Sequence, residues 1–462
     1  MRCIGIDIGS SSIKGGILNL ESGLVEHTEK AAFPGQLPGL PAGFHEVDPQ
    51  AVVLCTREVL CKLLQAAPAT TQVRFTSQMG GILLLDAQHK PVTNYLSWRD
   101  QRSLLPAPGR SIPLIDQLRQ AWNDQQFEEL GKELKPGSAT TLLCWLAQHQ
   151  QLPRQTMPVT IGDYVIASIC NAPPRMHRSH GIGMINLKTS DWHHDAFAAA
   201  GIDGLHWPPL ATESETVGHF TNNGQQLECF AAIGDQQAAL FGIDLSCSEL
   251  SINCSTGSQV SQITAQFQPG NCQTRCWFDG QFLNTVTHIP AGRSLTVLES
   301  LLTELPRAAG ISLTNSWQLI AEATEHSAAN GLSCDLSFFS GAMGNQGRIE
   351  NITTENLTVG SLFCAAFDFM ADSYLECSNR LSSSPSWNQL AVSGGLVQAF
   401  PALRRRLAER FAWPMREVAE QEETLTGLLK LARRTASGTI SVAATWAKMQ
   451  HGTGKKRPAA FA

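Results

Sequence analysis

The stretch CIGIDIGSSSIKGGIL, residues 3 to 18, has the pattern of a strand, a turn of small residues and a second strand. Side chains alternate along a strand, so its isoleucines face one side and Gly5, Asp7 and Gly9 the other. Asp7 is therefore either a structural acid hydrogen-bonded at the turn or a carboxylate that faces a ligand. Small residues on its side would let a ligand come close, and successive backbone N–H groups in such a turn form a concave anion site.

A second stretch of the same form, ELSINCSTGSQVSQIT, occupies residues 249 to 264. One such hairpin is common in proteins without a phosphate ligand, but two of them suggest two related domains that hold one polyphosphate between them. Neither hairpin is a P-loop, because GxxxxGK[ST] is absent, and neither has the GxGxxG spacing of a dinucleotide site. We therefore predict an α/β protein with two RNase H-like domains, of the actin/hexokinase ATPase type, and a central cleft.

The chain length of 462 residues is compatible with two or three domains. We expect an N-terminal domain over residues 1–243, a C-terminal domain over 244–450 and a polar tail over 451–462. Apolar residues at three-and-four spacing predict helices over residues 49–67, 139–150, 357–381 and 400–412.

The composition argues against several kinds of partner. A net charge of -6 provides no electrostatic reason to expect nucleic acid or an anionic membrane. No apolar run approaches the roughly 20 residues that span a bilayer. The 13 cysteines, without a signal peptide, indicate reduced thiols and a cytoplasmic location. Cys272 and Cys276 have the spacing of a metal-binding pair, but no second pair accompanies them.

A second acid stands in CFAAIGDQQAALFGIDL, residues 229 to 245. There a strand ends in Gly234 and Asp235, and a helix begins with Gln236. An acid at the end of a buried strand, followed by small helix residues, is placed to meet a ligand in a cleft. The alternative is an aspartate that only caps the helix, which is a frequent role.

The segments GIDIGSSSIKGGIL and GDQQAALFG together resemble the FGGY carbohydrate kinases, which transfer the γ-phosphoryl group of ATP to a sugar or polyol hydroxyl. The resemblance extends over nearly the whole chain, through GFHEVDPQAVV, SQMGGILLLD, LSWRDQR, NCSTGSQVSQ and AVSGGLVQAFPALRRRLAERF in that order. Within the family, GRIENITTENLTVGSLFCAAFDFMADSYLE and SATTLLCWLAQ are most similar to sedoheptulokinases. The resemblance implies conversion of sedoheptulose to sedoheptulose 7-phosphate. A xylulose- or ribulose-type kinase is the alternative, followed by a non-catalytic sugar- or nucleotide-binding protein of the same fold.

The resemblance also implies roles for individual residues. Phosphoryl transfer needs an in-line hydroxyl, charge neutralisation on the phosphates and a group that receives the hydroxyl proton. Asp235 resembles the family's catalytic base, and Asp7 its magnesium-associated acid, acting through water. ATP and Mg²⁺ are therefore the expected cofactors. The residues expected at the phosphates and the nucleotide are Gly9, Ser10, Ser11, Ser12, Lys14, Thr256, Gly257, Gly292, Gly394, Gly395 and Gln398.

The expected partners are a small sugar and ATP, with a homodimer left open and neither nucleic acid nor membrane expected. By resemblance, the sugar contacts are Gln78, Met79, Trp98, Asp100, Arg102, Asp235 and Gln236. Two segments depart from the family pattern. Gly80 stands where many ketose kinases have histidine, which removes one hydrogen-bond partner for the sugar. Gly341-Ala342-Met343 stands where the family usually has Gly-Glu-Arg.

Overall fold

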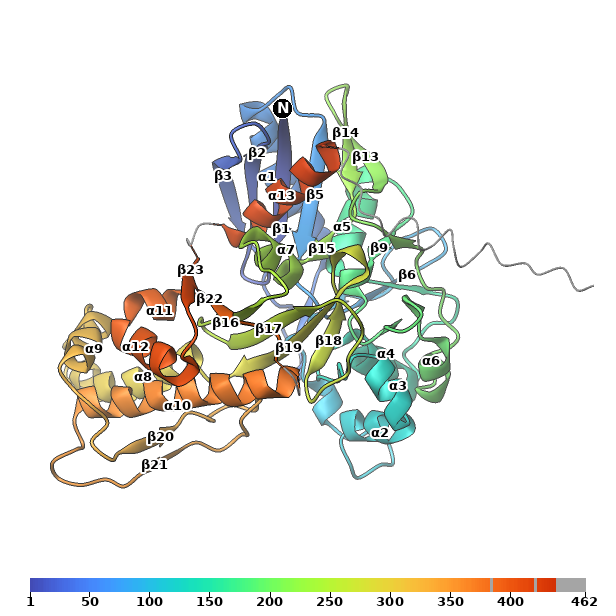
Figure 1. Cartoon of the computed structure of the whole chain (residues 1–462). Helices are drawn as coiled ribbons and strands as arrows, with labels where there is room; N and C mark the ends of the chain where they lie inside the picture. Colours follow the sequence, from blue (N-terminus) through green and yellow to red (C-terminus); the bar gives the residue numbers. More distant parts are fainter. Residues whose placement is uncertain (383–384, 419–421, 438–462) are drawn as a thin grey trace, which may run out of the picture.

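The computed structural model describes residues 1–382, 385–418 and 422–437 and has two lobes, each built on a mixed β-sheet (Figure 1). The first sheet has the strand order β13-β14-β5-β1-β2-β3, with β15 beside β5, and the second β18-β19-β17-β16-β22-β23. The strands of the first sheet are β1 (Arg2–Ile8), β2 (Ser12–Asn19), β3 (Leu24–Ala32), β5 (Gln72–Ser77), β13 (Thr216–Asn222), β14 (Gln225–Phe230) and β15 (Ile233–Gly234). Those of the second are β16 (Glu249–Asn253), β17 (Ser258–Thr264), β18 (Gln273–Cys276), β19 (Phe282–Ile289), β22 (Gln389–Ser393) and β23 (Met415–Glu417).

The two sheets repeat one topology around the two predicted hairpins. β1 pairs antiparallel with β2 and parallel with β5, and β5 continues parallel to β14. β16 likewise pairs antiparallel with β17 and parallel with β22, and β22 continues parallel to β23. The outer partners β3 and β19 are both antiparallel to the second strand of their hairpin. This repeat is what two RNase H-like domains require.

Helices cover both faces of the first sheet. On one face α1 (Pro49–Ala66) and α5 (Ile161–Cys170) pack on the alternate isoleucines of β1, as the sequence pattern predicts. On the other face lie α7 (Asp235–Gly242) and α13 (Glu423–Ala436). The expectation that Gly5 lets a ligand approach is wrong, because the place of its missing Cβ lies 3.0 Å from a methyl group of Leu18 in the α13 core.

Helix α13 returns to the first lobe from the far end of the chain, and Figure 1 shows it in red beside β1 and β5. It crosses α7 at two glycines. A Cβ on Gly242 would lie 2.1 Å from the carbonyl oxygen of Glu423, and one on Gly427 would lie 2.0 Å from that of Ala238. Only glycine permits this close backbone approach. The predicted range of 244–450 for the second domain therefore includes a helix that packs on the first.

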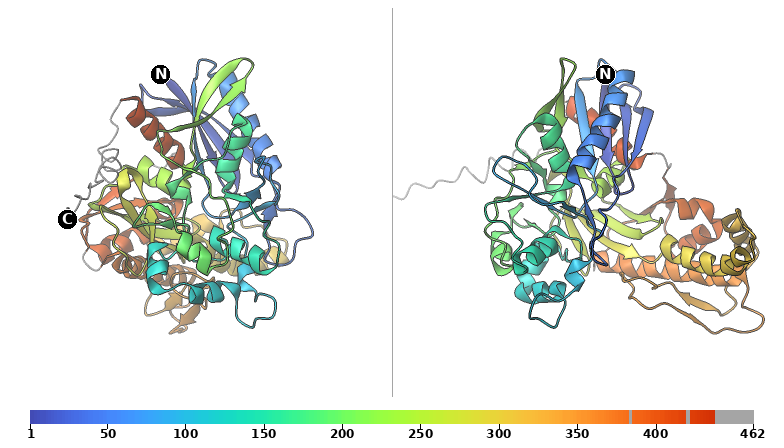
Figure 2. Two further views of the ribbon diagram at one scale, coloured as in Figure 1. Left: turned by 90° about the vertical axis from the view of Figure 1, so that its right-hand side faces the viewer. Right: turned by 180° about the vertical axis from the view of Figure 1, so that it is seen from behind.

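The remaining helices lie in an insertion of the first lobe and in the second lobe. The insertion holds α2 (Leu114–Ala121), α3 (Asp124–Glu129), α4 (Ala139–Gln148) and α6 (His194–Ala199) around a core of its own. The second lobe holds α8 (Gly292–Ala308), α9 (Ser316–Glu325), α10 (Val359–Leu381), α11 (Gly395–Ala399) and α12 (Pro401–Phe411). Figure 2 shows α10 running along this lobe, where its face with Phe363, Phe367 and Tyr374 is buried in the core. The helices predicted from periodicity are confirmed as α1, α4, α10 and α12.

Five two-stranded sheets complete the sheet structure of the described residues. Their strands are β4 (Glu46–Val47) with β7 (Tyr95–Leu96), β6 (Leu83–Leu85) with β8 (Met157–Val159), β9 (Met176–His177) with β12 (Leu210–Ala211), β10 (Ile185–Asn186) with β11 (Asp191–Trp192), and β20 (Ser333–Asp335) with β21 (Arg348–Glu350). In the described ranges no helix combines the length and the apolar character needed to cross a membrane. The predicted polar tail, residues 451–462, lies outside the described residues.

Candidate active site

Asp7 lies near the end of β1, directly opposite Lys14 of β2. Residues that face each other across an antiparallel pair project to the same side of the sheet, here the side of α13. Asp7 Oδ2 accepts a hydrogen bond of 2.8 Å from Thr424 Oγ1, while Lys14 Nζ lies 3.3 Å from Glu422 Oε2. The start of α13 therefore completes the surroundings of the first hairpin.

The other oxygen of Asp7, Oδ1, is buried and has no hydrogen-bond partner among the described residues. Burial, and secondly the charge of Asp235, raise the pKa of Asp7 to about 7, although Thr424 and Lys14 act in the opposite direction. A carboxylate with only a structural role would have both oxygens satisfied, because buried polar groups are normally hydrogen-bonded. The arrangement therefore favours the ligand-facing alternative for Asp7.

These features fit a magnesium ion. Carboxylate oxygens are the ligands that Mg²⁺ prefers, and Mg²⁺ in phosphoryl-transfer sites is usually held by one or two carboxylates together with substrate phosphates. In the part of the chain that the structure describes, no three His, Cys, Asp or Glu side chains cluster closely enough to hold a metal by themselves. Asp7 would accordingly hold the ion together with the phosphates.

The turn of the first hairpin is partly closed on itself. The N–H of Gly9 donates to the carbonyl oxygen of Ser12 at 3.1 Å. This amide is therefore engaged, whereas the prediction was that it binds a phosphate. Ser10 and Ser11 remain at the tip, where Ser11 is exposed. Arg99 reaches this tip and donates from Nη2 to Ser10 Oγ at 3.1 Å. It adds a positive charge that was not among the predicted site residues.

Asp235 is the first residue of α7, after the N-cap Gly234. Its Oδ1 accepts the N–H of the next residue, Gln236, at 2.8 Å, but Gly234 is the N-cap and no side chain caps the helix, so Asp235 is not the N-cap aspartate of the alternative reading. Burial nevertheless raises the pKa of Asp235 to about 6, with that N–H and Arg275 acting in the opposite direction. β1 and β15 both pair in parallel with β5, so the two acids lie at the same edge of the sheet although they are far apart in the sequence, and the charge of Asp235 raises the pKa of Asp7.

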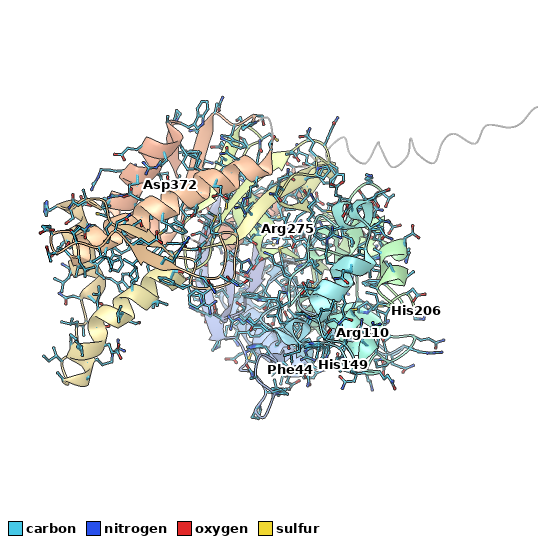
Figure 3. The ribbon with its side chains drawn as sticks, turned by 90° about the horizontal axis from the view of Figure 1, so that it is seen from below. Phe44, Arg110, His149, His206, Arg275 and Asp372 are labelled. Atoms are coloured by element: carbon cyan, nitrogen blue, oxygen red, sulfur yellow. The ribbon has the colours of Figure 1, made fainter. Side chains whose placement is uncertain are left out.

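Gln236 links Asp235 to the second lobe. Its side-chain amide donates to Ser261 and Thr285, at 3.3 and 3.1 Å. Its oxygen accepts from Arg275 of β18, which also forms a buried ion pair of 2.5 Å with Glu133 of the first lobe. Figure 3 labels Arg275, which lies at the boundary between the lobes. Gln236 is therefore a structural link, and its amide is already engaged.

Gln78 and Met79 follow β5, next to Gly234, the residue before Asp235. The Met79 sulfur is 2.7 Å from where a Cβ of Gly234 would be, so the two residues are in contact. Gln78 is 2% exposed, and both polar atoms of its side chain are without partners among the described residues. An unsatisfied buried amide costs free energy that a ligand or water hydroxyl would recover. This placement agrees with the predicted sugar contacts.

Asp100 and Arg102, which were predicted to contact the sugar, form a buried ion pair with each other. Both oxygens of Asp100 are occupied, by the Arg102 guanidinium at 2.9 and 2.8 Å and by the N–H of His45 at 2.7 Å. Arg102 also pairs with Glu46 at 2.6 Å, and both residues of the Asp100–Arg102 pair are buried. They hold the segment that carries Trp98, which is 38% exposed, and do not offer free groups to a sugar.

The second hairpin forms the other wall. Its tip residues Thr256 and Gly257 are exposed. Gly292 and Gly394 pack against its backbone: Cβ atoms there would lie 3.1 Å from the Ser255 carbonyl oxygen and 2.2 Å from that of Cys254. Gly394 has φ +101, a backbone conformation that favours glycine.

A cavity of about 220 Å³ lies beside the second hairpin, and its lining includes Gly394 and Gln398. Gly395 begins α11 next to it and is exposed. The structure thus places the predicted nucleotide residues of the second lobe together.

The two segments that depart from the family pattern pack against different parts of the structure. Gly80 has φ +78, and a Cβ on it would lie 3.1 Å from Trp98 Cβ and 3.4 Å from the carbonyl oxygen of Gly137. The N–H of Ala342, in the 341–343 loop, donates to the carbonyl oxygen of His288 at 3.2 Å. The loop therefore packs on the end of β19.

Sequence reasoning missed Arg99, Thr424, Glu422 and Arg275. Arg99 stands inside the quoted segment LSWRDQR, between two residues that were selected. The other three come from segments with no local signal, since they reach the site only through the return of α13 and the contact between the lobes.

Comparison with known proteins agrees with this geometry. The model of the FGGY family of carbohydrate kinases, N-terminal domain, matches residues 2–242. A gluconokinase of Bacillus subtilis is 23% identical over 221 residues, which cover 47% of this chain and 41% of that protein. A xylulose kinase of Staphylococcus xylosus is 24% identical over 323 residues, 65% of this chain and 63% of that protein. The chain thus spans about half the length of the curated relatives it matches.

Solved structures show the same fold over almost the whole chain. A ligand-bound xylulose kinase from Lactobacillus acidophilus has a TM-score of 0.83 at 15% identity, covering 96% of this chain and 91% of that one. The Plasmodium falciparum glycerol kinase with ADP has a TM-score of 0.78 at 14% identity, covering 97% and 92%. The predicted architecture, two domains of the actin/hexokinase ATPase type, is confirmed.

Proposed function

The chain belongs to the FGGY family of carbohydrate kinases, and from this premise we propose that it transfers the γ-phosphoryl group of ATP to a hydroxyl group of a small sugar. One observation carries the proposal. Asp7, near the end of β1, and Asp235, directly after β15, lie at the same edge of the first sheet because both strands pair in parallel with β5, and the charge of Asp235 raises the pKa of Asp7. Such a costly pair of acids is typical of a catalytic site.

In this proposal Asp235 orients the acceptor hydroxyl and receives its proton. The pKa of Asp235, about 6, keeps the carboxylate ionised at neutral pH and near the operating range of a general base. Because the transition state of phosphoryl transfer is loose, the proton leaves late, and the position of the base matters more than its strength. The hydrogen bond from the N–H of Gln236 fixes that position.

The phosphates would lie between the two hairpins. Ser10, Ser11 and Lys14 of the first lobe and Thr256 and Gly257 of the second would bind them from opposite sides. Mg²⁺ bound with Asp7 would neutralise charge on the phosphates, which favours attack by the hydroxyl. Closure of the lobes would exclude water, which competes with the sugar for the phosphoryl group.

The acceptor that the sequence resemblance supports is a ketose, with sedoheptulose first and xylulose or ribulose as the alternative. The relatives named above include xylulose kinases and gluconokinases, which support a pentulose or a sugar acid as further candidates. A panel of four- to seven-carbon ketoses, sugar acids and polyols, compared by kcat/KM with ATP, selects among them. Sedoheptulose inactive beside an active pentulose would overturn the first choice and leave the kinase assignment intact.

The variant Asp235→Ala tests the assignment of the base. We expect loss of sugar phosphorylation by a factor of about 10² to 10⁴, with nucleotide binding and the unfolding midpoint retained. Asp244→Ala is the matched control, because Asp244 follows the same helix and its exposed carboxylate pairs with Lys430. Full turnover in Asp235→Ala would refute the role of Asp235.

A non-catalytic binding protein of the same fold is the second candidate. Gly80 and the altered 341–343 loop favour it, because both replace groups that kinases of the family usually have. Sugar-dependent release of ADP separates the two candidates: none with any acceptor of the panel, together with intact nucleotide binding, would favour the binding protein.

A further inference from the structure

The loop that joins α3 to α4, residues 130–138, borders the acceptor side of the proposed site. The carbonyl oxygen of Gly137 accepts the N–H of Gly81 at 2.9 Å, and a Cβ on Gly137 would lie 1.9 Å from the carbonyl oxygen of Trp98. The loop is therefore pressed against the segment in which a sugar-binding histidine was expected at position 80. Lys135 stands two residues before Gly137.

Lys135 crosses from this loop to the second lobe. Its Nζ donates to Thr287 Oγ1 and, at 2.9 Å, to His288 Nδ1. His288 has φ +62, an uncommon conformation for a residue with a side chain. The charge of Lys135 disfavours protonation of this imidazole and lowers the pKa of His288 to about 3. Burial and the charges of Arg275 and Arg293 act in the same direction. The imidazole is therefore neutral and accepts the hydrogen bond.

The register of β19 places Lys135 on the wall that carries Gln236. Thr285 binds the Gln236 amide, and Thr287 binds the Lys135 ammonium group. Residues two apart on a strand project to the same face, about 7 Å apart. Gln236 follows the proposed base directly, so Lys135 contacts the same face of β19 as the neighbour of Asp235.

The charge of Lys135 is not compensated by a direct ion pair. Within the described residues, no carboxylate lies within ion-pair distance of its Nζ, whereas the nearby Arg275 has Glu133. Burial lowers the pKa of Lys135 to about 8. The charge of Glu133 opposes this shift, and the charge of Arg275 adds to it. An ammonium group has three donors and no acceptor, and two of the three are engaged. One donor and an unpaired charge remain for a ligand.

We propose that Lys135 is a substrate-binding residue of the acceptor site. Its ammonium group binds the oxygen at the end of the sugar remote from the phosphorylated hydroxyl, and it replaces the side chain absent at Gly80. The inference rests on the proposed kinase function and deepens it. Carbonyl and hydroxyl oxygens both accept a hydrogen bond from this ammonium group, whereas a carboxylate also pairs with its charge, so Lys135 selects sugar acids over neutral ketoses and polyols. Its charge contributes most to binding when that oxygen is negative.

The test compares Lys135→Met with the wild-type protein on three acceptors of equal chain length: a sugar acid, a ketose and a polyol. We expect KM in the variant to rise about 10- to 100-fold for the sugar acid and by less for the ketose and the polyol, whose neutral oxygens form no ion pair. The KM for ATP should not change. In the wild-type protein, acceptor KM should rise above about pH 8 as the ammonium group loses its proton, and Lys135→Arg should remove this rise.

Lys132→Met is the matched control. Lys132 belongs to the same loop and also crosses to the second lobe, where its Nζ donates to the carbonyl oxygen of Gly270 at 2.8 Å. If Lys135 served only to join the lobes, both variants would change all acceptors and ATP alike, and the proposal would be overturned. An unchanged order of acceptors in Lys135→Met would also overturn it.

The two levels of proposal fail in different ways. If the wild-type protein phosphorylates no acceptor, the kinase function fails, and binding of the same three compounds is then measured by calorimetry. If the wild-type protein binds the sugar acid most tightly and Lys135→Met does not, the binding role is still supported. Equal affinity of the two proteins for the sugar acid would refute it. Active phosphorylation with unaltered KM in Lys135→Met would refute the binding role alone.

Discussion

Asp7→Asn should stabilise the protein at pH 8 while it removes activity. Asparagine has nearly the same shape and can still accept the hydrogen bond from Thr424, so the change mainly removes a charge. The pKa of Asp7 rises from 3.8 to about 7 in the folded state. At 1.36 kcal/mol for each pH unit, this difference corresponds to about 4 kcal/mol as an upper value. Since the side chain is partly exposed, we expect about 2 kcal/mol or more.

The sign of the pH dependence follows from the direction of this change. Between pH 3.8 and about 7 the folded protein keeps a proton on Asp7 that the unfolded chain has lost. The free energy of unfolding therefore falls as the pH rises through this range. The variant has no proton to lose at this position. The two proteins should thus differ little near pH 4 and most above pH 7.

Urea unfolding at a series of pH values, followed by tryptophan fluorescence, measures the difference between the two midpoints. Asp100→Asn is the matched control, since Asp100 is buried but satisfied by Arg102. Removing one partner of a buried pair should destabilise the protein by about 3 kcal/mol, the opposite sign. A lower midpoint for Asp7→Asn at pH 8, or a difference that does not depend on pH, would refute the account of Asp7 as an unsatisfied acid.

Three further variants test the surroundings of the site. Gly394→Ala places a Cβ about 2.2 Å from the Cys254 carbonyl oxygen, so the second hairpin must shift and the KM for ATP should rise; an unchanged KM would contradict a nucleotide site there. Thr424→Val removes a bond that lowers the pKa of Asp7, so the acidic limb of the pH–activity profile should move to higher pH; no movement would dissociate Asp7 ionisation from activity. Arg275→Met leaves a buried carboxylate unpaired and should cost about 3–5 kcal/mol in urea unfolding; a neutral effect would show that the lobes do not depend on this ion pair.

Much of the fold follows from local sequence patterns. The alternation in β1 and the small residues of its turn predict a hairpin wherever they occur, because side-chain direction in a strand depends only on position. The same pattern at residues 249–264 predicts the second lobe, and the structure shows the repeated strand order around both. Asp7 and Asp235 could be selected in the same way, since each ends a strand.

The local pattern was misleading where a second element covers the residue. Gly5 has the signature of an open ligand face, yet it accommodates Leu18 beneath α13. Asp100 and Arg102 have the charges of sugar contacts, yet they satisfy each other. Sequence position indicates which side of a strand a residue occupies, but not what packs against that side.

The sequence by itself determined the two hairpins, the two acids and the family, because each depends on residue type and spacing within a short segment. Only the tertiary structure decided which groups share the site with them. The return of α13 brings Thr424 to Asp7, and the contact between the lobes brings Lys135 to Thr287 and His288. These neighbours are far apart in the chain, and their contacts result from helix packing and sheet register that no short segment encodes.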